Sequence, residues 1–265
     1  MLESVSGAEV GQKSRVSYSM RALGRHDLPC AITIGGEVYR HIRTIKHDFF
    51  AATGFFENAA GECVVAKVGR TAPFAGIAMD WVGRFLCRRE LRFYRALADL
   101  PNVPRLLGTF GKTGFVHAFV PGQPLQRQLK VPDGFFDRLQ SLMAEVHKRR
   151  IAYVDANKSP NILVGDDGLP YLIDFQISWD IHVMGDTPVN RWCLARMQRE
   201  DLYHILKHKR RLRPDELTAE ELDATRRPSL LIRAHRFITR PYFRLRRTTF
   251  KRLRASGKLL PDGSA

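Results

Sequence analysis

Apolar and polar residues alternate over 38–45 as in a β-strand, after a polar start to the chain. Residues 1–13 lack this pattern and are expected to be disordered, and a short basic helix is expected at 14–25. Five stretches that resemble strands follow, separated by turn-forming residues: 38–45, 54–56, 63–68, 103–110 and 114–120. Because tight turns join the first three, the pattern predicts an antiparallel sheet.

Apolar residues recur every three or four positions in other segments, which predicts helices at 78–98, 135–149 and 191–209. The expected apolar positions of the first are Trp81, Phe85, Leu91, Tyr94 and Leu97. Those of the second are Phe136, Leu139, Leu142, Met143 and Val146. Thr218 and Glu221 have the spacing of a capping box, which marks the start of a further helix.

A hairpin is predicted at 162–173, because two apolar runs flank the turn-forming residues 165–168. Asn161 precedes its first strand and Asp174 follows its second, so the hairpin brings an amide and a carboxylate to the same end of a small sheet. Asp155 lies in the loop before Asn161. Such oxygen ligands suit Mg²⁺ and a polyphosphate, because Mg²⁺ keeps several waters and needs few protein ligands.

The order of these residues resembles the catalytic loop and metal-binding motif of the protein kinase-like superfamily. Residues 158–161 read Lys-Ser-Pro-Asn and match its Lys-x-x-Asn, and Asp174 begins Asp-Phe-Gln where Asp-Phe-Gly is expected. The resemblance implies Asp155 as the catalytic base, Lys158 as a neutralising cation, and Asn161 and Asp174 as metal ligands. Six positions rather than five separate Asp155 from Asn161, and a one-residue bulge before Lys158 is expected to restore the register.

A lysine and a glutamate extend this resemblance toward the N-terminus. Residues 64–67 read Val-Val-Ala-Lys, similar to the Val-Ala-Ile-Lys of the third kinase strand, whose lysine holds the α- and β-phosphates. Glu90 follows Lys67 by about two dozen positions on the next predicted helix, where the family places the glutamate that orients this lysine. Taken alone, Lys67 suits a solvated strand face and Glu90 suits ordinary ion pairs with neighbouring arginines.

The resemblance also implies a hinge and a phosphate-covering loop. Backbone groups near Phe119 and Val120 would meet the adenine edge at the hinge. The glycine-rich loop of kinases corresponds to residues 46–54, where one glycine remains. The triphosphate is therefore expected either to be held more loosely or to be covered by Lys46 and His47.

The chain has about ninety residues after Ser178, without the Ala-Pro-Glu motif of larger kinases. In this it resembles RIO-type and lipopolysaccharide-sugar (Kdo) kinases, as does His147, which is expected to be structural. The fold class expected is α+β, a two-lobed protein kinase-like fold with an antiparallel sheet and a helix in the N-lobe and a reduced, mainly helical C-lobe. The expected regions are an N-terminal extension, an N-lobe, a C-lobe and a basic helical tail, at 1–36, 37–120, 121–225 and 226–265.

Composition adds a preference for anionic partners, because 43 Lys and Arg residues against 27 Asp and Glu give a net charge of +16. Arginines and aromatics interleave over 226–258, where Pro241 separates two short expected helices. Such a tail suits an anionic membrane surface, RNA, or a solvated basic face of the protein. Four scattered cysteines indicate neither a disulfide framework nor a zinc site. No apolar run approaches the ~20 residues of a membrane span, and the expected location is cytoplasmic, with a peripheral place on the inner membrane face.

The expected function is an ATP-dependent phosphotransferase that uses Mg²⁺ and moves the γ-phosphoryl group to a hydroxyl acceptor. Either a protein serine or threonine or a sugar-lipid fits this expectation. Two alternatives stay open: a pseudokinase that acts as a binding module, which the missing glycines favour, and an RNA-associated protein that acts through the basic tail.

Overall fold

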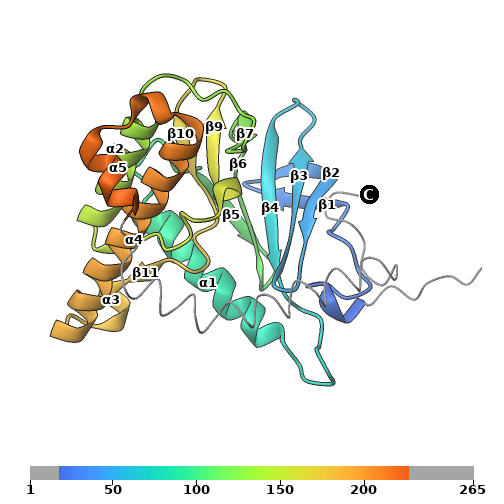
Figure 1. Ribbon diagram of the computed structural model, residues 1–265. Helices are drawn as coiled ribbons and strands as arrows, with labels where there is room; N and C mark the ends of the chain where they lie inside the picture. The colour runs from blue at the N-terminus through green and yellow to red at the C-terminus, as the bar shows by residue number, and fades with distance from the viewer. Residues whose placement is uncertain (1–17, 227–265) are drawn as a thin grey trace, which may run out of the picture.

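The N-terminal half of the protein is an antiparallel sheet with strand order β1-β2-β3-β4-β6-β5. The computed structural model describes residues 18–226, and the predictions for 1–17 and 227–265 lie outside the described residues. The strands are β1 (Ala31–Ile34), β2 (Glu37–His47), β3 (Ala51–Glu57), β4 (Cys63–Gly69), β5 (Leu106–Phe110) and β6 (Gly114–Ala118). Figure 1 shows this sheet on one side of the molecule and most of the helices on the other.

All five predicted strands of this sheet are confirmed, and β1 is an addition that the sequence pattern missed. Ile32 and Ile34 of β1 are buried in the sheet core, and Gly35 and Gly36 form the turn into β2 with positive φ angles. The sheet curls until β1 approaches β5, since a Cβ atom on Gly108 would lie 2.9 Å from Cγ2 of Ile34. A strand of four residues carries too short an alternation to be distinguished from the polar extension before it.

Helix α1 (Asp80–Ala96) confirms the predicted helix at 78–98 and carries a buried Glu90. A Cβ atom on Gly83 would lie 2.0 Å from the carbonyl oxygen of Arg70, so the helix touches the strand backbone there. Trp81 and Phe85, two of the apolar positions of the predicted helix, are exposed. Each lies two positions before a residue that faces the sheet, Gly83 or Cys87, and two positions turn an α-helix by roughly 200°.

The C-terminal half is mainly helical. Its helices are α2 (Phe135–Lys148), α3 (Ile181–Met184), α4 (Pro188–Leu212) and α5 (Ala219–Arg226). A small antiparallel sheet has the order β10-β9-β7, formed by β7 (Gly122–Pro124), β9 (Ile162–Gly165) and β10 (Pro170–Leu172). A second pairs β8 (Ile151–Ala152) with β11 (Trp179–Asp180). The core of this half continues onto the buried side of α1, through Phe93, Tyr94 and Leu97.

These elements confirm the α+β, two-lobed, kinase-like fold. The predicted hairpin and the helices at 135–149 and 191–209 are present, and the last is longer than predicted. The capping box is formed in both directions, since the Glu221 N–H donates to Thr218 Oγ1 at 3.2 Å and the Thr218 N–H donates to Glu221 Oε2 at 3.1 Å. Of the helix expected at 14–25, the described part shows a 3-10 turn at Tyr18–Met20. Among residues 18–226, no helix has the length and apolar character needed to cross a membrane.

Candidate active site

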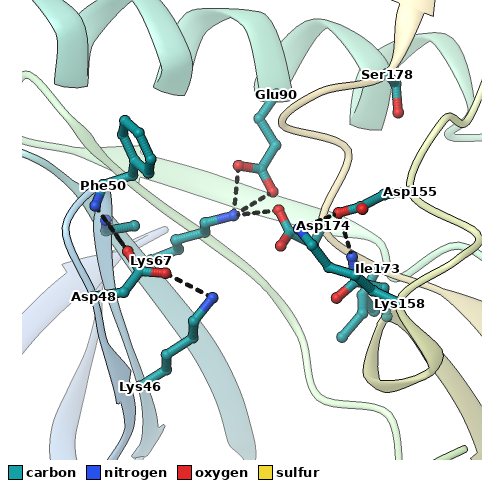
Figure 2. Close-up of polar contacts among 12 residues, drawn as sticks. Lys46, Asp48, Phe50, Lys67, Glu90, Asp155, Lys158, Ile173, Asp174 and Ser178 are labelled. Carbon is teal, nitrogen blue, oxygen red and sulfur yellow. Dashed lines mark hydrogen bonds and ion pairs between the residues drawn. The ribbon is translucent and has the colours of Figure 1, made fainter. Parts of the chain in front are cut away.

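Lys67 lies at the centre of an ion cluster built from three distant parts of the chain. Its Nζ atom is 2.8 Å from Oε2 of Glu90 and 2.8 Å from Oδ1 of Asp174 (Figure 2). Lys67 stands on β4, which pairs with β3 on one side and β6 on the other, and Glu90 projects from α1. The structure therefore brings together the lysine, the glutamate and the aspartate that the sequence singled out.

The charges of this cluster stabilise one another in a buried setting. Burial alone would lower the pKa of Lys67, but the carboxylates of Glu90 and Asp174 outweigh it, and the net pKa of Lys67 is raised. Burial raises the pKa of Glu90 to about 7, although Lys67 opposes this change. Burial also acts to raise the pKa of Asp174, and Lys67 more than reverses it, so that the pKa is lowered. The cluster therefore holds a cation beside a carboxylate that stays ionised.

Asp174 is held in position by the residues on either side of it. Its backbone is left-handed, with a φ of 62°. Before it, the Ile173 N–H donates to the carbonyl oxygen of Asn161 at 3.1 Å, and the Tyr153 hydroxyl donates to the Ile173 carbonyl. After it, the ring of Phe175 packs edge-on against Tyr153, at 5.4 Å between ring centroids, and against Tyr94 of α1. These contacts connect the Asp174 backbone to both lobes.

Asp155, Lys158 and Asn161 form a second cluster within one loop. The Asp155 Oδ2 atom accepts hydrogen bonds from Lys158 Nζ and from Asn161 Nδ2, both at 2.7 Å. Two successive turns explain the spacing: the Lys158 N–H donates to the Asp155 carbonyl, and the Asn161 N–H donates to the Lys158 carbonyl, both at 3.0 Å. With three residues in each turn, side chains at i, i+3 and i+6 share one side. Each turn spans three positions, and the two together account for the six positions that separate Asp155 from Asn161.

The carboxylate of Asp155 is more basic than usual. Burial is the main cause of its raised pKa, the negative charge of Asp174 adds to it, and Lys158 opposes it. Asp155 is 5% exposed, whereas the side chain of Lys158 is 58% exposed and can reach outward. The arrangement supplies a basic carboxylate with an exposed cation beside it.

The turn between β2 and β3 also differs from a glycine-rich loop in its backbone hydrogen bonds. The Asp48 Oδ1 atom accepts hydrogen bonds from the N–H groups of Phe50 and Ala51, at 2.8 and 2.9 Å. The backbone donors that cover phosphates in a glycine-rich loop are thus occupied here by a side chain. The Nζ atom of Lys46 is 2.7 Å from Oδ2 of Asp48. Figure 2 shows this ion pair beside the Lys67 cluster.

His47 does not cover the site as expected. Its Nε2 atom accepts a hydrogen bond from the Leu23 N–H at 3.1 Å, and its Nδ1 atom accepts one from Arg21 Nε at 3.1 Å. Gly54, the remaining glycine of this stretch, serves packing, since a Cβ atom there would lie 2.6 Å from Cδ1 of Leu28. Both residues connect the sheet to the segment before β1, which the sequence pattern did not reveal.

Phe119 and Val120 follow β6 directly, where the chain passes from one lobe to the other. Both are half-buried, and the ring of Phe119 packs edge-on against Phe55 of β3, at 5.3 Å between centroids. His117, one position before the end of β6, is buried and stacks on Tyr94. Burial lowers the pKa of His117 to about 4. Phe119 and Val120 therefore lie between the lobes, beside a histidine that stays neutral at pH 7.

Asp201 is a functional candidate that sequence reasoning missed. It is fully buried on α4, and its carboxylate accepts hydrogen bonds from the N–H groups of Tyr153 and Val154 at 2.8 and 2.7 Å. Val154 has a left-handed backbone with a φ of 68°, so Asp201 fixes a strained conformation next to Asp155. His147 Nε2 is 3.1 Å from Asp201 Oδ2, in keeping with a structural role. Asp201 lies one helical turn before the buried Ile205. An acid at an otherwise apolar position of the predicted helix was therefore the sequence signal for it.

The donor set of the site suits Mg²⁺ better than a protein-caged metal. Among residues 18–226, no group of three or more His, Cys, Asp or Glu side chains could hold a metal ion. Of the residues that the resemblance assigns to the metal, Asp174 offers a carboxylate and Asn161 offers the Oδ1 atom of its amide, since its Nδ2 atom donates a hydrogen bond to Asp155. Few protein oxygens together with phosphates and waters are what Mg²⁺ takes in nucleotide sites.

Comparison with known proteins supports the fold and leaves the family open. No protein-family profile matches the sequence, and no curated protein matches it. A crystal structure of the Rio2 kinase-ADP/Mg²⁺-phosphoaspartate complex from Chaetomium thermophilum matches with a TM-score of 0.50 and 17% identity, over 70% of this chain and 61% of that chain. A further structure of the same kinase matches at 18% identity, a TM-score of 0.49, and 67% and 59% of the two chains. The chain thus spans less than two thirds of that kinase, and it has a kinase-like fold of RIO-type resemblance.

Proposed function

We propose that the protein is an ATP-dependent phosphotransferase that moves a γ-phosphoryl group to a hydroxyl acceptor. The observation that carries this proposal is the position of Lys67, whose ammonium group lies between the carboxylates of Glu90 and Asp174. Glu90 fixes the lysine, and Asp174 is kept ionised next to it. A lysine held in this way offers a cation to phosphate oxygens on a rigid strand.

The nucleotide would lie between the two lobes. In this proposal, the backbone near Phe119 and Val120 receives the adenine edge, and Lys67 contacts the phosphates. The ADP and Mg²⁺ of the similar Rio2 structure support a site of this kind. Asn161 and Asp174 would hold Mg²⁺, which neutralises phosphate charge when bound. Because Lys67 contacts Asp174 directly in this structure, binding of the nucleotide is expected to lengthen that contact.

Asp155 would accept the proton of the attacking hydroxyl group. A general base works best with a pKa close to the working pH, and burial moves the pKa of Asp155 upward. Lys158, mostly exposed beside it, would neutralise charge on the phosphoryl group during transfer. Protein hydroxyls and sugar-lipid hydroxyls both fit this chemistry, and we propose the acceptor at the level of a hydroxyl group.

One observation favours a second candidate, a pseudokinase that binds nucleotide without turnover. Asp48 occupies the backbone donors of the β2–β3 turn, so these donors do not face a triphosphate. A loosely held γ-phosphate would slow transfer while Lys67 still allows binding. The RNA alternative depends on the tail at 226–258, nearly all of which lies outside the described residues.

A thermal-shift titration with Mg·ATP tests the proposal, because a ligand of the folded state raises the melting temperature by mass action. We expect a concentration-dependent rise for the wild type that falls sharply in Asp174→Asn. Asp166→Asn, an exposed aspartate in the β9–β10 turn, is the matched control and should behave like the wild type. Transfer or hydrolysis of γ-labelled ATP, lost in Asp174→Asn, separates the enzyme from the pseudokinase. No shift at millimolar Mg·ATP would contradict both candidates.

A further inference from the structure

Exposed apolar side chains gather in two short segments of the described chain. Nine of the sixteen large apolar side chains that are exposed within residues 18–226 fall in residues 74–85 and 177–192. We call eight of them the aromatic face: Ile77, Trp81, Phe85, Ile177, Val183, Met184, Val189 and Trp192. Single exposed apolar residues are ordinary on protein surfaces, but a concentration of this kind indicates an interaction site.

The second segment begins against the middle of α1, one to two helical turns beyond the exposed residues of the first segment. Arg89 of α1 donates a hydrogen bond from Nη2 to the carbonyl oxygen of Ser178 at 2.6 Å, and Arg92 Nε is 3.7 Å from Asp180 Oδ2. Phe85 precedes Arg89 by one helical turn, and Ile177 precedes Ser178 directly. In Figure 1 the start of α1 and helix α3 lie well apart along the lower edge of the molecule, so a flat surface along that edge meets both. The aromatic face is therefore assembled from both lobes.

All three tryptophans of the chain lie in these segments, at positions 81, 179 and 192. Trp81 and Trp192 are each 59% exposed, and Trp179 is half-buried. Tryptophan favours the boundary of a lipid bilayer, where its ring meets acyl chains and its N–H meets headgroups. The neighbouring exposed residues Ile77 and Val189 are aliphatic, so they gain from hydrocarbon and have no ring to stack on a nucleic-acid base.

The charge on α1 favours an anionic surface. After Phe85, the same side of the helix continues with Arg88 and Arg95, which are exposed, and with Arg92, which is half-buried and lies 3.7 Å from Asp180. The acids of α1 are Asp80, which pairs with Arg84 at 2.7 Å, and the buried Glu90. Aromatic residues at one end and arginines along the rest are the composition of an interfacial helix on acidic lipids.

We propose that the aromatic face docks the protein on an anionic lipid bilayer, with Trp81, Phe85 and Trp192 inserted at the headgroup boundary. Since Ile177 is three residues beyond Asp174, such docking would bring the proposed phosphotransfer cleft close to the membrane. The proposal does not depend on catalysis, because lipid binding is measured without ATP.

Tryptophan fluorescence of the full-length protein tests this directly. With vesicles of phosphatidylcholine and phosphatidylglycerol whose acyl chains are brominated, we expect quenching and a blue shift that weaken strongly with neutral vesicles. The Phe85→Ser/Val189→Ser variant keeps all three tryptophans and should need roughly tenfold more lipid for the same quenching, since it loses two exposed apolar side chains that would enter the bilayer. Val38→Ser/Ile42→Ser removes two apolar residues exposed on β2 and should match the wild type.

Charge is tested separately by Arg88→Glu/Arg95→Glu, for which we expect weaker quenching on anionic vesicles. Arg40→Glu/Lys112→Glu changes the net charge equally at other exposed positions and is the control. Sedimentation with vesicles but no tryptophan quenching would overturn the proposal, because another part of the chain would then bind lipid. Equal quenching in the Phe85→Ser/Val189→Ser variant would overturn it as well. So would a concentration-dependent dimer that this variant dissociates, because the face would then be occupied by a second copy.

Discussion

The two ion clusters of the site differ in how the chain builds them. The Lys67 cluster joins a strand, a helix and a loop, and the hydrogen bond from Lys67 to Asp174 spans 107 positions of sequence. The Asp155 cluster lies within seven residues of one loop, where two short turns align its three side chains. The first depends on the packing of the two lobes, and the second depends on local backbone geometry. Substitutions should therefore affect stability at the first cluster and mainly turnover at the second.

The largest effect is expected from Asp155→Asn, if the proposed function holds. Asparagine retains the shape of the side chain but cannot accept the proton of the attacking hydroxyl, and loss of a general base slows turnover by about 10²–10⁴-fold. The free energy of unfolding should change by less than about 1 kcal/mol, and the thermal shift with Mg·ATP should persist. Single-turnover transfer and urea unfolding measure the two quantities. A large loss of stability would show that this cluster is as structural as the other.

A second effect, on stability, is expected from Lys67→Met. Without the ammonium group, Glu90 and Asp174 become neighbouring buried carboxylates, and removal of one partner from a buried ion pair costs about 3 kcal/mol or more. The pKa of Glu90, already about 7, should rise further, so the folded state gains a proton as the pH falls. The deficit in the free energy of unfolding, relative to the wild type, should thus be large at pH 8 and smaller at pH 5. Lys112→Met, at an exposed turn, should show no deficit at either pH.

The smallest effect concerns His117, which lies near the Lys67 cluster and has a pKa of about 4. The unfolded histidine has a pKa near 6.5, so between these values the unfolded chain binds the proton more tightly and acid favours unfolding. The wild type should lose stability between pH 7 and pH 4.5, and in His117→Gln this loss should be smaller by about 2 kcal/mol. Urea unfolding across this range measures it. Burial also lowers the pKa of His47 to about 4. His47 should therefore cause part of the acid-induced loss of stability that His117→Gln still shows.

The sequence predicted the elements whose signal is local and repeated. The Asp155 loop, the hairpin and Lys67 could all be found, because motif spacing and alternation lie within short windows. Trp81 and Phe85 fit the apolar period of α1 but are exposed, since the side of α1 that faces the sheet is set by the close approach at Gly83. Asp201 was missed because its partners are backbone N–H groups, which no residue pattern records.

The contact between Asp201 and the loop has a consequence for synthesis of the protein. The N–H of Tyr153 and the carboxylate that holds it are 48 positions apart, and the carboxylate is made later. A ribosome that has translated Asp174, just after the β9–β10 hairpin, has therefore produced every side chain of the two clusters without Asp201, which holds the backbone of Tyr153 and Val154. We expect loop amides in stalled nascent chains to exchange freely until α4 has left the exit tunnel. Protection that appears before Asp201 emerges would show that the loop forms without it. The order of synthesis would thus keep the site unformed until most of the described chain exists.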